Sequence, residues 1–411
     1  MLGLIVARRE KVFPLCGGLS INHSFNGSPD DSIHLRLHGA GSGELRMRWR
    51  LVVFVVYLLL VGVVGTRADN AFLQEPLRIL LPSDLGTLEA LLVRPNAPGR
   101  YPLALIAHGS PRSAAERPDV TPLAMLPRAL EFACRGWAAL IVMRRGYGNS
   151  DGGWAETFGP CGNPNYIAAG TAGAADLKLA LEFVSHRPDI DPSRMIAVGV
   201  SAGGFATVAL TADPPPGLVA AISFAGGRGS MQDGQDCRSD KLVAAFRAFG
   251  ARSRIPMLWV YAANDYFFGP DLAKELDATF TGAGGNVTFV AAPAFGNDGH
   301  GLFSPAGIPL WTPYVDAFLQ KQNLKLRETP LPLPVPDLAA PPQLGVSGRS
   351  ALATYAIDAP HKAFAVAPDG AFGWKSGART TEKTRAGALK FCQQHAQHCD
   401  VKFIDDAEVR H

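Results

Sequence analysis

The stretch MIAVGVSAGGFATVAL, residues 195–210, decides the expected fold of this chain. It begins with an apolar run typical of a buried strand, passes through a Gly-x-Ser-x-Gly turn centred on Ser201, and continues with small and apolar residues at helical spacing. In such an elbow the serine hydroxyl projects from the edge of the sheet, and the helix N-terminus faces developing negative charge. Gly199, Ala202 and Gly203 leave room for the close backbone approach that the elbow needs. We therefore predict that Ser201 is a nucleophile.

A second match to the same pattern, GNSDG at residues 148–152, is centred on Ser150. An apolar strand precedes it, but the segment that follows, DGGWAETFGPCGNPNY at residues 151–166, is rich in glycine, proline and aromatic residues. This composition predicts a loop rather than a helix. Because the elbow needs a helix directly after the serine, we expect Ser150 to take no part in the chemistry.

Apolar runs of strand length alternate with helical patterns from Pro76 to about Leu326. The expected strands lie within residues 88–93, 102–108, 137–145, 195–200, 218–226, 257–263 and 286–292. The 3.6-residue period predicts helices at residues 119–134, 167–186, 202–211, 240–250, 271–282 and 312–322. The alternation predicts an α/β fold with a mostly parallel, doubly wound sheet and helices on both faces. Catalytic side chains are expected just after strands, where ligands bind on such sheets.

A serine hydroxyl becomes a strong nucleophile when a histidine accepts its proton and a carboxylate orients that histidine. Between Ser201 and the end of the alternating pattern the sequence has one histidine, His300, in the glycine-rich segment AFGNDGHGLF at residues 294–303. Asp265 follows an apolar strand directly and is the expected acid, although Asp298 is closer to the histidine in sequence. The alternative for His300 is a loop histidine that bonds only a backbone carbonyl.

Acyl transfer also needs hydrogen-bond donors aimed at the oxyanion. One expected donor is the backbone N–H of Ala202, the residue after the nucleophile. The other should come from the loop after an earlier strand, in LIAHGSPRS at residues 105–113. Because Pro111 has no N–H, Ser110 is the expected donor. His108 is expected to be a packed structural histidine rather than a proton carrier.

Three loop segments are expected to choose the substrate, at residues 154–166, 224–240 and 266–270. Their aromatic side chains are candidates for a partly aromatic pocket, namely Trp154, Tyr266, Phe267 and Phe268. The alternative is that these rings only pack the loops.

A leader pattern occupies the region that begins at Met47. Basic residues precede an uncharged apolar run at residues 51–64, and small residues follow up to Ala68. We therefore expect a signal peptide at residues 47–68, cut after about Ala68. An uncleaved membrane anchor is the alternative, but the run is shorter than the roughly 20 residues that span a bilayer. Residues 1–46 are expected to be disordered or to lie upstream of the biological start.

The net charge of +3 comes from this leader. Removing residues 1–68 takes away eight basic and four acidic residues and leaves 31 Lys and Arg against 32 Asp and Glu. A balanced charge gives no electrostatic case for binding nucleic acid. With the signal removed, we expect no stable membrane span and a secreted or periplasmic location.

Cysteine usage agrees with export. Cys16 lies in the excluded upstream segment, which leaves five cysteines, so one thiol is expected to stay free. Cys134, at an apolar helical end, is expected to be that thiol and to behave as a small buried hydrophobic residue. The other four are expected to form two disulfides, Cys161 with Cys237 and Cys392 with Cys399. The first of these would hold two segments of the pocket wall together.

The alternating pattern ends at the proline-rich segment 327–349, which is expected to be a linker. Beyond it, residues 350–411 show two strand-like arms around Asp369-Gly370, a hairpin turn signal, followed by a helical pattern and a strand-like run. We therefore expect a main domain at residues 69–326 and a small C-terminal α+β domain.

The motifs HGSP, RRGYGNSDGG, GVSAGG, YAANDYFF and DGHGLF occur in the order and spacing seen in the α/β-hydrolase superfamily, which the chain resembles over about residues 76–325. Within it the chain looks most like secreted dienelactone-hydrolase-like proteins, with prolyl-oligopeptidase-type peptidases as the neighbouring branch. Dienelactone hydrolases proper use a cysteine nucleophile where this chain has Ser201, so the resemblance does not imply dienelactone activity. The tail from about Ser350 resembles small secreted domains of unknown function.

The residues and the resemblance together predict a secreted serine hydrolase with an α/β-hydrolase fold. It is expected to cleave a carboxylic ester or amide bond of a small or polymeric substrate through an acyl-enzyme, with ester cleavage favoured. This chemistry needs no metal or organic cofactor. Two alternatives stay open: a prolyl-oligopeptidase-like serine peptidase, and a non-catalytic envelope protein that uses the scaffold for binding.

Overall fold

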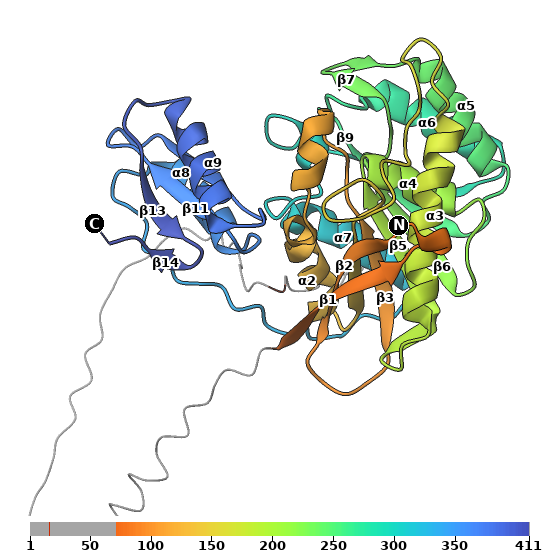
Figure 1. Ribbon diagram of the computed structural model, residues 1–411, viewed down its shortest axis with the longest axis horizontal. Helices are drawn as coiled ribbons and strands as arrows, with labels where there is room; N and C mark the ends of the chain where they lie inside the picture. The colour runs from red at the N-terminus through yellow and green to blue at the C-terminus, as the bar shows by residue number, and fades with distance from the viewer. Residues whose placement is uncertain (1–15, 17–70, 411) are drawn as a thin grey trace, which may run out of the picture. The chain divides into compact units, whose positions relative to one another are not determined.

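The computed structural model describes Cys16 and residues 71–410 (Figure 1). The expected signal peptide at residues 47–68 lies outside the described residues, as does all of the segment 1–46 except Cys16. Within the described part, no helix is long and apolar enough to cross a membrane.

Eight strands form the central sheet in the order β1-β2-β4-β3-β5-β6-β9-β10 (Figure 1). Their bounds are β1 Phe72–Leu80, β2 Thr87–Pro95, β3 Tyr101–Ala107, β4 Ala138–Val142, β5 Ile190–Val200, β6 Leu218–Phe224, β9 Pro256–Ala262 and β10 Asn286–Ala292. Strand β2 pairs antiparallel with β1 and β4, whereas every other pair in this sheet is parallel. The predicted mostly parallel α/β sheet is therefore confirmed.

Strand β1 is an element that the sequence pattern does not predict. Its segment FLQEPLRIL contains Pro76, which cannot donate to a sheet ladder. Proline is tolerated at a sheet edge, where the missing N–H is not needed by a second neighbour. β1 lies at the edge of the sheet and pairs only with β2, which explains how the segment forms a strand despite Pro76.

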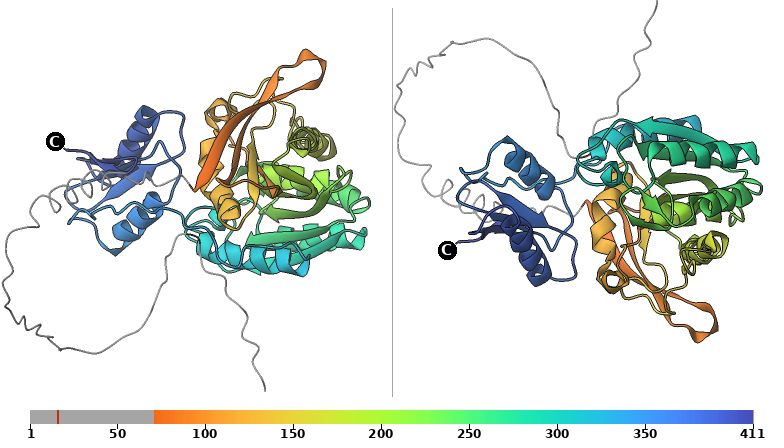
Figure 2. Two further views of the ribbon diagram at one scale, coloured as in Figure 1. Left: turned by 90° about the horizontal axis from the view of Figure 1, so that it is seen from below. Right: turned by 90° about the horizontal axis from the view of Figure 1, so that it is seen from above.

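Helices lie on both faces of the sheet (Figure 2). The helices of this part are α2 Leu126–Cys134, α3 Tyr166–Ser185, α4 Ala202–Leu210, α5 Ser239–Gly250, α6 Pro270–Gly282 and α7 Ile308–Lys321. Helices α3, α4 and α5 contact one another, and α5 contacts α6. On the other side, Arg135 at the end of α2 pairs with Asp316 of α7 at 3.0 Å. The predicted two-sided covering is confirmed.

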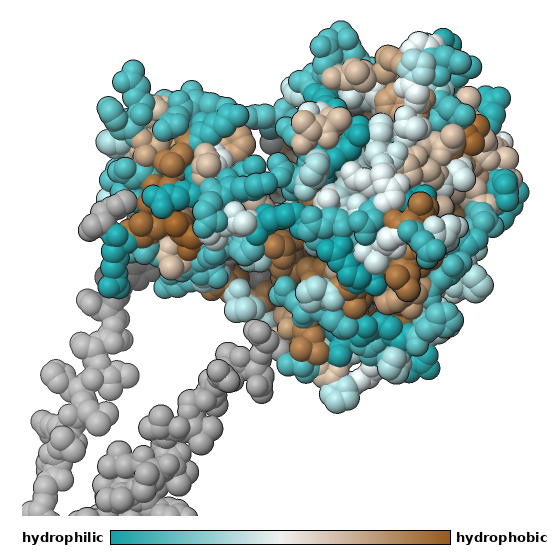
Figure 3. All heavy atoms as spheres, viewed as in Figure 1, coloured by the Kyte–Doolittle hydropathy of each residue, from teal (hydrophilic) through white to brown (hydrophobic). Residues whose placement is uncertain are grey.

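The main core follows from the two-residue period of the strands. In β3, Leu103, Leu105 and Ala107 point to the same face and are fully buried. They pack in one cluster with residues of α3, including Leu177 and Leu181, which are one helical turn apart. The result is a rigid sheet whose carboxyl edge can carry loops. On the face shown in Figure 3, hydrophilic and apolar residues are interspersed rather than gathered in a single extended apolar surface.

The C-terminal part forms a separate four-stranded sheet with two helices, and we call residues 344–410 the C-terminal unit. Its elements are α8 Val346–Ala356, β11 Ala363–Val366, β12 Phe372–Lys375, α9 Thr381–Gln393, β13 Asp400–Ile404 and β14 Ala407–Glu408, with strand order β12-β11-β13-β14. Strands β11 and β12 form the expected antiparallel hairpin, and Gly370 in its turn has a φ of 88°. Such a φ favours glycine. Tyr355, Phe364 and Phe403 are the large aromatic residues of its core.

Helix α8 begins inside the stretch that the sequence assigns to a linker. Leu344 precedes it and is only 1% exposed, packed with the core of the C-terminal unit. The segment from Gly345 to Ala356 has few large apolar residues, so its helical period is weak. Tertiary packing decides the secondary structure here.

The expectation that Cys134 stays unpaired is wrong. Cys134 at the end of α2 forms a disulfide with Cys16, and both residues are buried. Backbone hydrogen bonds join the same region to the proline-rich segment, because Leu331 donates to the carbonyl of Cys134 and Leu333 to that of Cys16. Because Cys16 lies in the segment expected to be upstream of the biological start, the sequence pattern leaves Cys134 without a partner.

Candidate active site

The expected nucleophile lies at the predicted elbow. Strand β5 ends at Val200 and helix α4 begins at Ala202, so Ser201 stands alone between them with φ 55° and ψ −123°. A non-glycine residue at such a φ is strained and is held only by its surroundings. A Cβ at position 199 would collide with the carbonyl of Gly203, and one at 203 with the carbonyl of Ala107. Glycine is therefore required at both positions for the tight turn.

The expected acid and base lie together after β9 and β10. Nδ1 of His300 is 3.1 Å from each carboxylate oxygen of Asp265, whose side chain is fully buried. Asp265 Oδ1 also accepts the backbone N–H groups of Phe267 at 2.7 Å and Phe268 at 3.0 Å. These bonds fix the carboxylate, and Phe267 stacks on the His300 ring with centroids 3.9 Å apart. The ring is thus oriented by a carboxylate on its edge and an aromatic face below it.

Asp298, the competing acid, has a different role. Its Oδ1 accepts the backbone N–H of His300 at 2.9 Å and that of Tyr266 at 3.1 Å. It therefore shapes the turn that carries His300, in the short helix η4 Gly299–Gly301, without contacting the imidazole through a hydrogen bond.

The cavity that contains Ser201 extends to the aromatic rings that pack against His300. Ser201 lines a cavity of about 180 Å³ together with Phe267 and Phe268, the two rings that pack against His300. Within residues 71–410, Ser201 Oγ makes no hydrogen bond to His300. Catalytic hydrogen bonds are often long in the free enzyme and tighten only when substrate binds.

The loop after β3 approaches Ser201 closely, as the expected second oxyanion donor requires. A Cβ at Gly109 would lie 3.3 Å from the Cβ of Ser201, so the backbone on either side passes directly beside it. Ser110 and Ala202 line the same cavity as Ser201. Ser110 Oγ lies 2.9 Å from the Tyr147 hydroxyl, which ties the loop to the chain after β4.

His108 is buried under this loop. Its Nδ1 lies 2.6 Å from the carbonyl of Gly109, and its Nε2 accepts the backbone N–H of Arg144 at 3.3 Å. Burial and the nearby Arg144 guanidinium lower the pKa of His108 to about 3, so the ring stays neutral at physiological pH. These contacts explain a structural role and leave no nitrogen free for proton transfer.

Ser150 is held entirely by the backbone. Its hydroxyl donates to the carbonyl of Met143 at 2.6 Å and accepts the N–H of Glu89 at 2.8 Å. No helix follows it, because residues 151–160 have no regular secondary structure. The hydroxyl joins the segment after β4 to strand β2.

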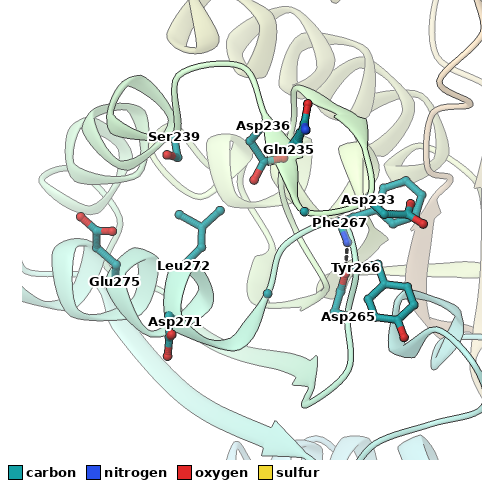
Figure 4. A pocket seen from close by; sticks show the side chains of 12 residues that line it. Asp233, Gln235, Asp236, Ser239, Asp265, Tyr266, Phe267, Asp271, Leu272 and Glu275 are labelled. Atoms are coloured by element: carbon teal, nitrogen blue, oxygen red, sulfur yellow. Dashed lines mark hydrogen bonds between the residues drawn. The ribbon is translucent and has the colours of Figure 1, made fainter.

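The four candidate aromatic residues divide between two neighbouring cavities. Trp154, Phe267 and Phe268 line the cavity that contains Ser201. Tyr266, 48% exposed, lines a larger and more open cavity of about 870 Å³, to which Phe267 also contributes (Figure 4). This second cavity is rich in carboxylates, namely Asp233, Asp236, Asp265, Asp271 and Glu275.

A buried ion network lies under the Ser201 cavity, and the sequence patterns do not predict it. Glu156 is 2% exposed and pairs with Arg144 and Arg228, the latter at 2.7 Å. Burial raises the pKa of Glu156, but the two guanidinium groups outweigh it and lower the pKa to about 2. The sequence signal for this network is the presence of charged residues within the glycine-rich and aromatic segments after β4 and β6. Their convergence depends on loop paths that local patterns do not encode.

Both predicted disulfides are present in the structure. Cys161 and Cys237 are joined with their Cα atoms 4.8 Å apart, and Cys392 is joined to Cys399. The N–H of Cys237 donates to the carbonyl of Gly229 at 2.9 Å. The first bridge therefore holds the loop after β6, which carries Arg228, against the loop before α3.

The strand order, the antiparallel pairing of β2 with both of its neighbours and the serine elbow after β5 define the α/β-hydrolase class of fold. Residues 86–267 match the model of the X-Pro dipeptidyl-peptidase family (S15). A curated relative, poly(3-hydroxyalkanoate) depolymerase C of Paucimonas lemoignei, is 26% identical over 243 residues, which are 53% of this chain and 54% of that protein. The chain thus spans about half the length of this relative.

Solved structures similar to this chain include both esterases and peptidases. A putative dienelactone hydrolase from Klebsiella pneumoniae is 19% identical, covers 61% of this chain and all of its own, and has a TM-score of 0.42. The Pyrococcus furiosus esterase is 15% identical, with 62% and 93% covered and a TM-score of 0.44. The Pyrococcus horikoshii acylaminoacyl peptidase is 15% identical, with 66% and 44% covered and a TM-score of 0.45.

Proposed function

We propose that this protein is a serine hydrolase that cleaves a carboxylic ester or amide through an acyl-enzyme. The observation that carries the proposal is the pairing of His300 with a buried, hydrogen-bonded Asp265 beside a cavity that contains the elbow serine. His300 Nε2 takes the proton of Ser201 Oγ as that oxygen attacks the substrate carbonyl carbon. Asp265 holds Nδ1–H and stabilises the imidazolium that forms.

The remaining steps follow from the same residues. The backbone N–H groups of Ala202 and Ser110 receive the negative oxygen of the tetrahedral intermediate. His300 then gives its proton to the leaving oxygen or nitrogen, and the acyl group stays on Ser201. Water attacks the acyl-enzyme with His300 as base, which releases the acid and restores the serine.

Ester cleavage is the preferred form of the proposal, and peptide cleavage is the alternative. The curated relative that matches this chain is a depolymerase of poly(3-hydroxyalkanoate), whose units are joined by esters. The family model that matches residues 86–267 is that of a peptidase, which favours the alternative. Both bonds are cleaved by the same acyl-enzyme chemistry, so the choice lies in the pocket rather than in the serine.

We further propose that the protein acts outside the cytoplasm. Three disulfides occur among the described residues, and such bonds persist in oxidising compartments. The signal pattern at residues 47–68 supports the same location.

The test compares labelling of the full chain by a fluorophosphonate probe. We expect wild type and Ser150→Ala to be labelled, and Ser201→Ala to be neither labelled nor active, because the acyl-enzyme cannot form. Ser150→Ala is a matched control because its serine lies in the same sequence pattern. Labelling that survives Ser201→Ala would contradict the proposal. Turnover of p-nitrophenyl esters of increasing acyl length, compared with aminoacyl amides, then separates esterase from peptidase.

A further inference from the structure

The cavity that contains Ser201 is strongly asymmetric in charge. Three of its lining residues are arginines, Arg112, Arg117 and Arg228, and no carboxylate lines it. Its other walls are aromatic or small, including Trp154. A cavity lined with cations and no anion on its surface attracts an anionic group.

The carboxylates behind the cavity do not balance these charges. Glu156 forms ion pairs with both Arg228 and Arg144, so one buried carboxylate faces two buried guanidinium groups. Both terminal nitrogens of Arg228 donate hydrogen bonds to Glu156, one to Oε2 at 2.7 Å and one to the backbone carbonyl at 2.9 Å. Its Nε has no hydrogen-bond partner in the described part of the chain.

Arg117 has no acidic partner among residues 71–410. Its guanidinium stacks on Trp154 at 3.4 Å from the ring centroid, and its buried Nε is without a hydrogen-bond partner in this range. Burial, together with the charge of Arg228, lowers the pKa of Arg117. A partly buried guanidinium held flat by an indole is oriented but not neutralised.

Arg112 lies at the exposed side of the cavity. It pairs with Asp233 at 2.9 Å, and its guanidinium lies 3.8 Å from the centroid of Phe267. An exposed ion pair of this kind is weak and exchanges readily with a ligand. The four arginines in and under the cavity therefore face two carboxylates, Glu156 and Asp233, and this group of residues carries an excess of two positive charges.

We propose that this cavity binds a carboxylate on the substrate, so that the enzyme prefers esters or amides with one arm ending in a carboxylate, held by Arg117 and Arg228. The inference rests on the proposed function for its catalytic part, and it names the substrate class of that site. The planar fork of the Arg117 guanidinium matches the two oxygens of a carboxylate, whereas Arg228 adds its positive charge and its Nε–H. The cavity, at about 180 Å³, has room for a short acyl arm rather than a long chain.

The kinetic test uses two esters that differ only in charge, mono-p-nitrophenyl glutarate and its methyl-capped neutral ester. We expect wild type to favour the charged ester in kcat/KM by about tenfold or more, with the preference shrinking as salt is raised. Arg117→Gln should reduce this ratio about tenfold. Arg238→Gln, an exposed arginine paired with Asp240 and absent from the cavity lining, should leave the ratio unchanged.

A binding test separates this inference from the proposed function. Glutarate titrated into Ser201→Ala by calorimetry should bind, and binding should weaken about tenfold in Ser201→Ala with Arg117→Gln. Binding without any turnover in wild type would contradict the proposed function and leave the carboxylate site in place. Turnover of the neutral ester equal to or faster than that of the charged one, or no glutarate binding, would overturn this inference alone. Inorganic phosphate binding more tightly than glutarate would overturn the assignment to a carboxylate.

Discussion

The Nδ1 atom of His300 lies equally close, 3.1 Å, to both carboxylate oxygens of Asp265. The carboxylate cannot rotate away, because Oδ1 also accepts two backbone N–H groups of the loop after β9. The ring in turn is packed on Phe267. The pair is therefore preorganised before any substrate arrives, which is how such a pair contributes to catalysis.

Replacing the acid should abolish most activity without unfolding the protein. Asp265→Asn is expected to lower kcat by about 10³ to 10⁴-fold, because the amide no longer fixes the tautomer or stabilises the imidazolium. Asp298→Asn is the control, since its carboxylate bonds only backbone N–H groups. Steady-state kinetics on a p-nitrophenyl ester measure both variants. A larger loss for Asp298→Asn would mean that the acid is misassigned.

Asp236, in the acidic cavity of Figure 4, should make the protein less stable at neutral pH. Burial and the negative charge of Asp265 raise the pKa of Asp236 to about 6, although Arg112 opposes this. The folded state then binds the proton more tightly than the unfolded state, so stability falls as pH rises from about 4 to about 6. Asp236→Asn should therefore raise the melting temperature at pH 8 and not at pH 4.

The matched control for that experiment is Asp240→Asn. The hydrogen bond from Arg238 lowers the pKa of this exposed carboxyl, so the sign of the effect is reversed. Melting temperatures recorded between pH 4 and pH 8 should show no gain at pH 8 for Asp240→Asn. An equal gain in both variants would refute the special environment of Asp236.

The disulfide between Cys161 and Cys237 should contribute both stability and substrate positioning. It closes a loop of 76 residues in sequence separation, for which the chain-entropy model gives about 4 kcal/mol. The double variant Cys161→Ser, Cys237→Ser is expected to lose up to that amount in denaturant unfolding. It should also raise KM, because the bridge holds the loop that carries Arg228. Unchanged KM would show that the loop keeps its path without the bridge.

A bidentate ion pair joins the C-terminal unit to strand β2. Arg379 donates to both oxygens of Glu89 at 2.8 Å and to the carbonyl of Val120 at 3.1 Å. Burial raises the pKa of Glu89, but bonds from Arg379 and the Asn149 N–H outweigh it and lower the pKa overall. The stability from this pair is thus present above the usual carboxyl pKa and is lost as pH falls through the lowered value.

Arg379→Gln should therefore destabilise the protein by about 1 to 3 kcal/mol at pH 7, with a smaller difference below about pH 4. Lys383→Gln breaks an exposed pair with Asp119 between the same two parts of the chain and should cost less than about 0.5 kcal/mol. Denaturant unfolding at the two pH values measures both. Equal losses for the two variants would refute the dominant role of Arg379.

The sequence by itself determined the sheet apart from β1, the elbow, and the meeting of Asp265 with His300. These features have local signals: apolar runs of strand length, a glycine pattern that only a tight turn requires, and polar residues placed directly after strands. Asp265 and His300 come together because the strands before them, β9 and β10, are parallel neighbours, which carries both loops to the same edge.

Only the tertiary structure decided how the loops fill the space above that edge. Arg117, Arg228 and Glu156 lie far apart in the chain, in segments without any period, and their meeting depends on loop paths fixed by a disulfide and by packing. The same reason explains the edge strand β1 with its proline, the start of α8 and the bond between Cys16 and Cys134. Each depends on what a segment packs against, and burial against a distant partner leaves no mark in the local pattern.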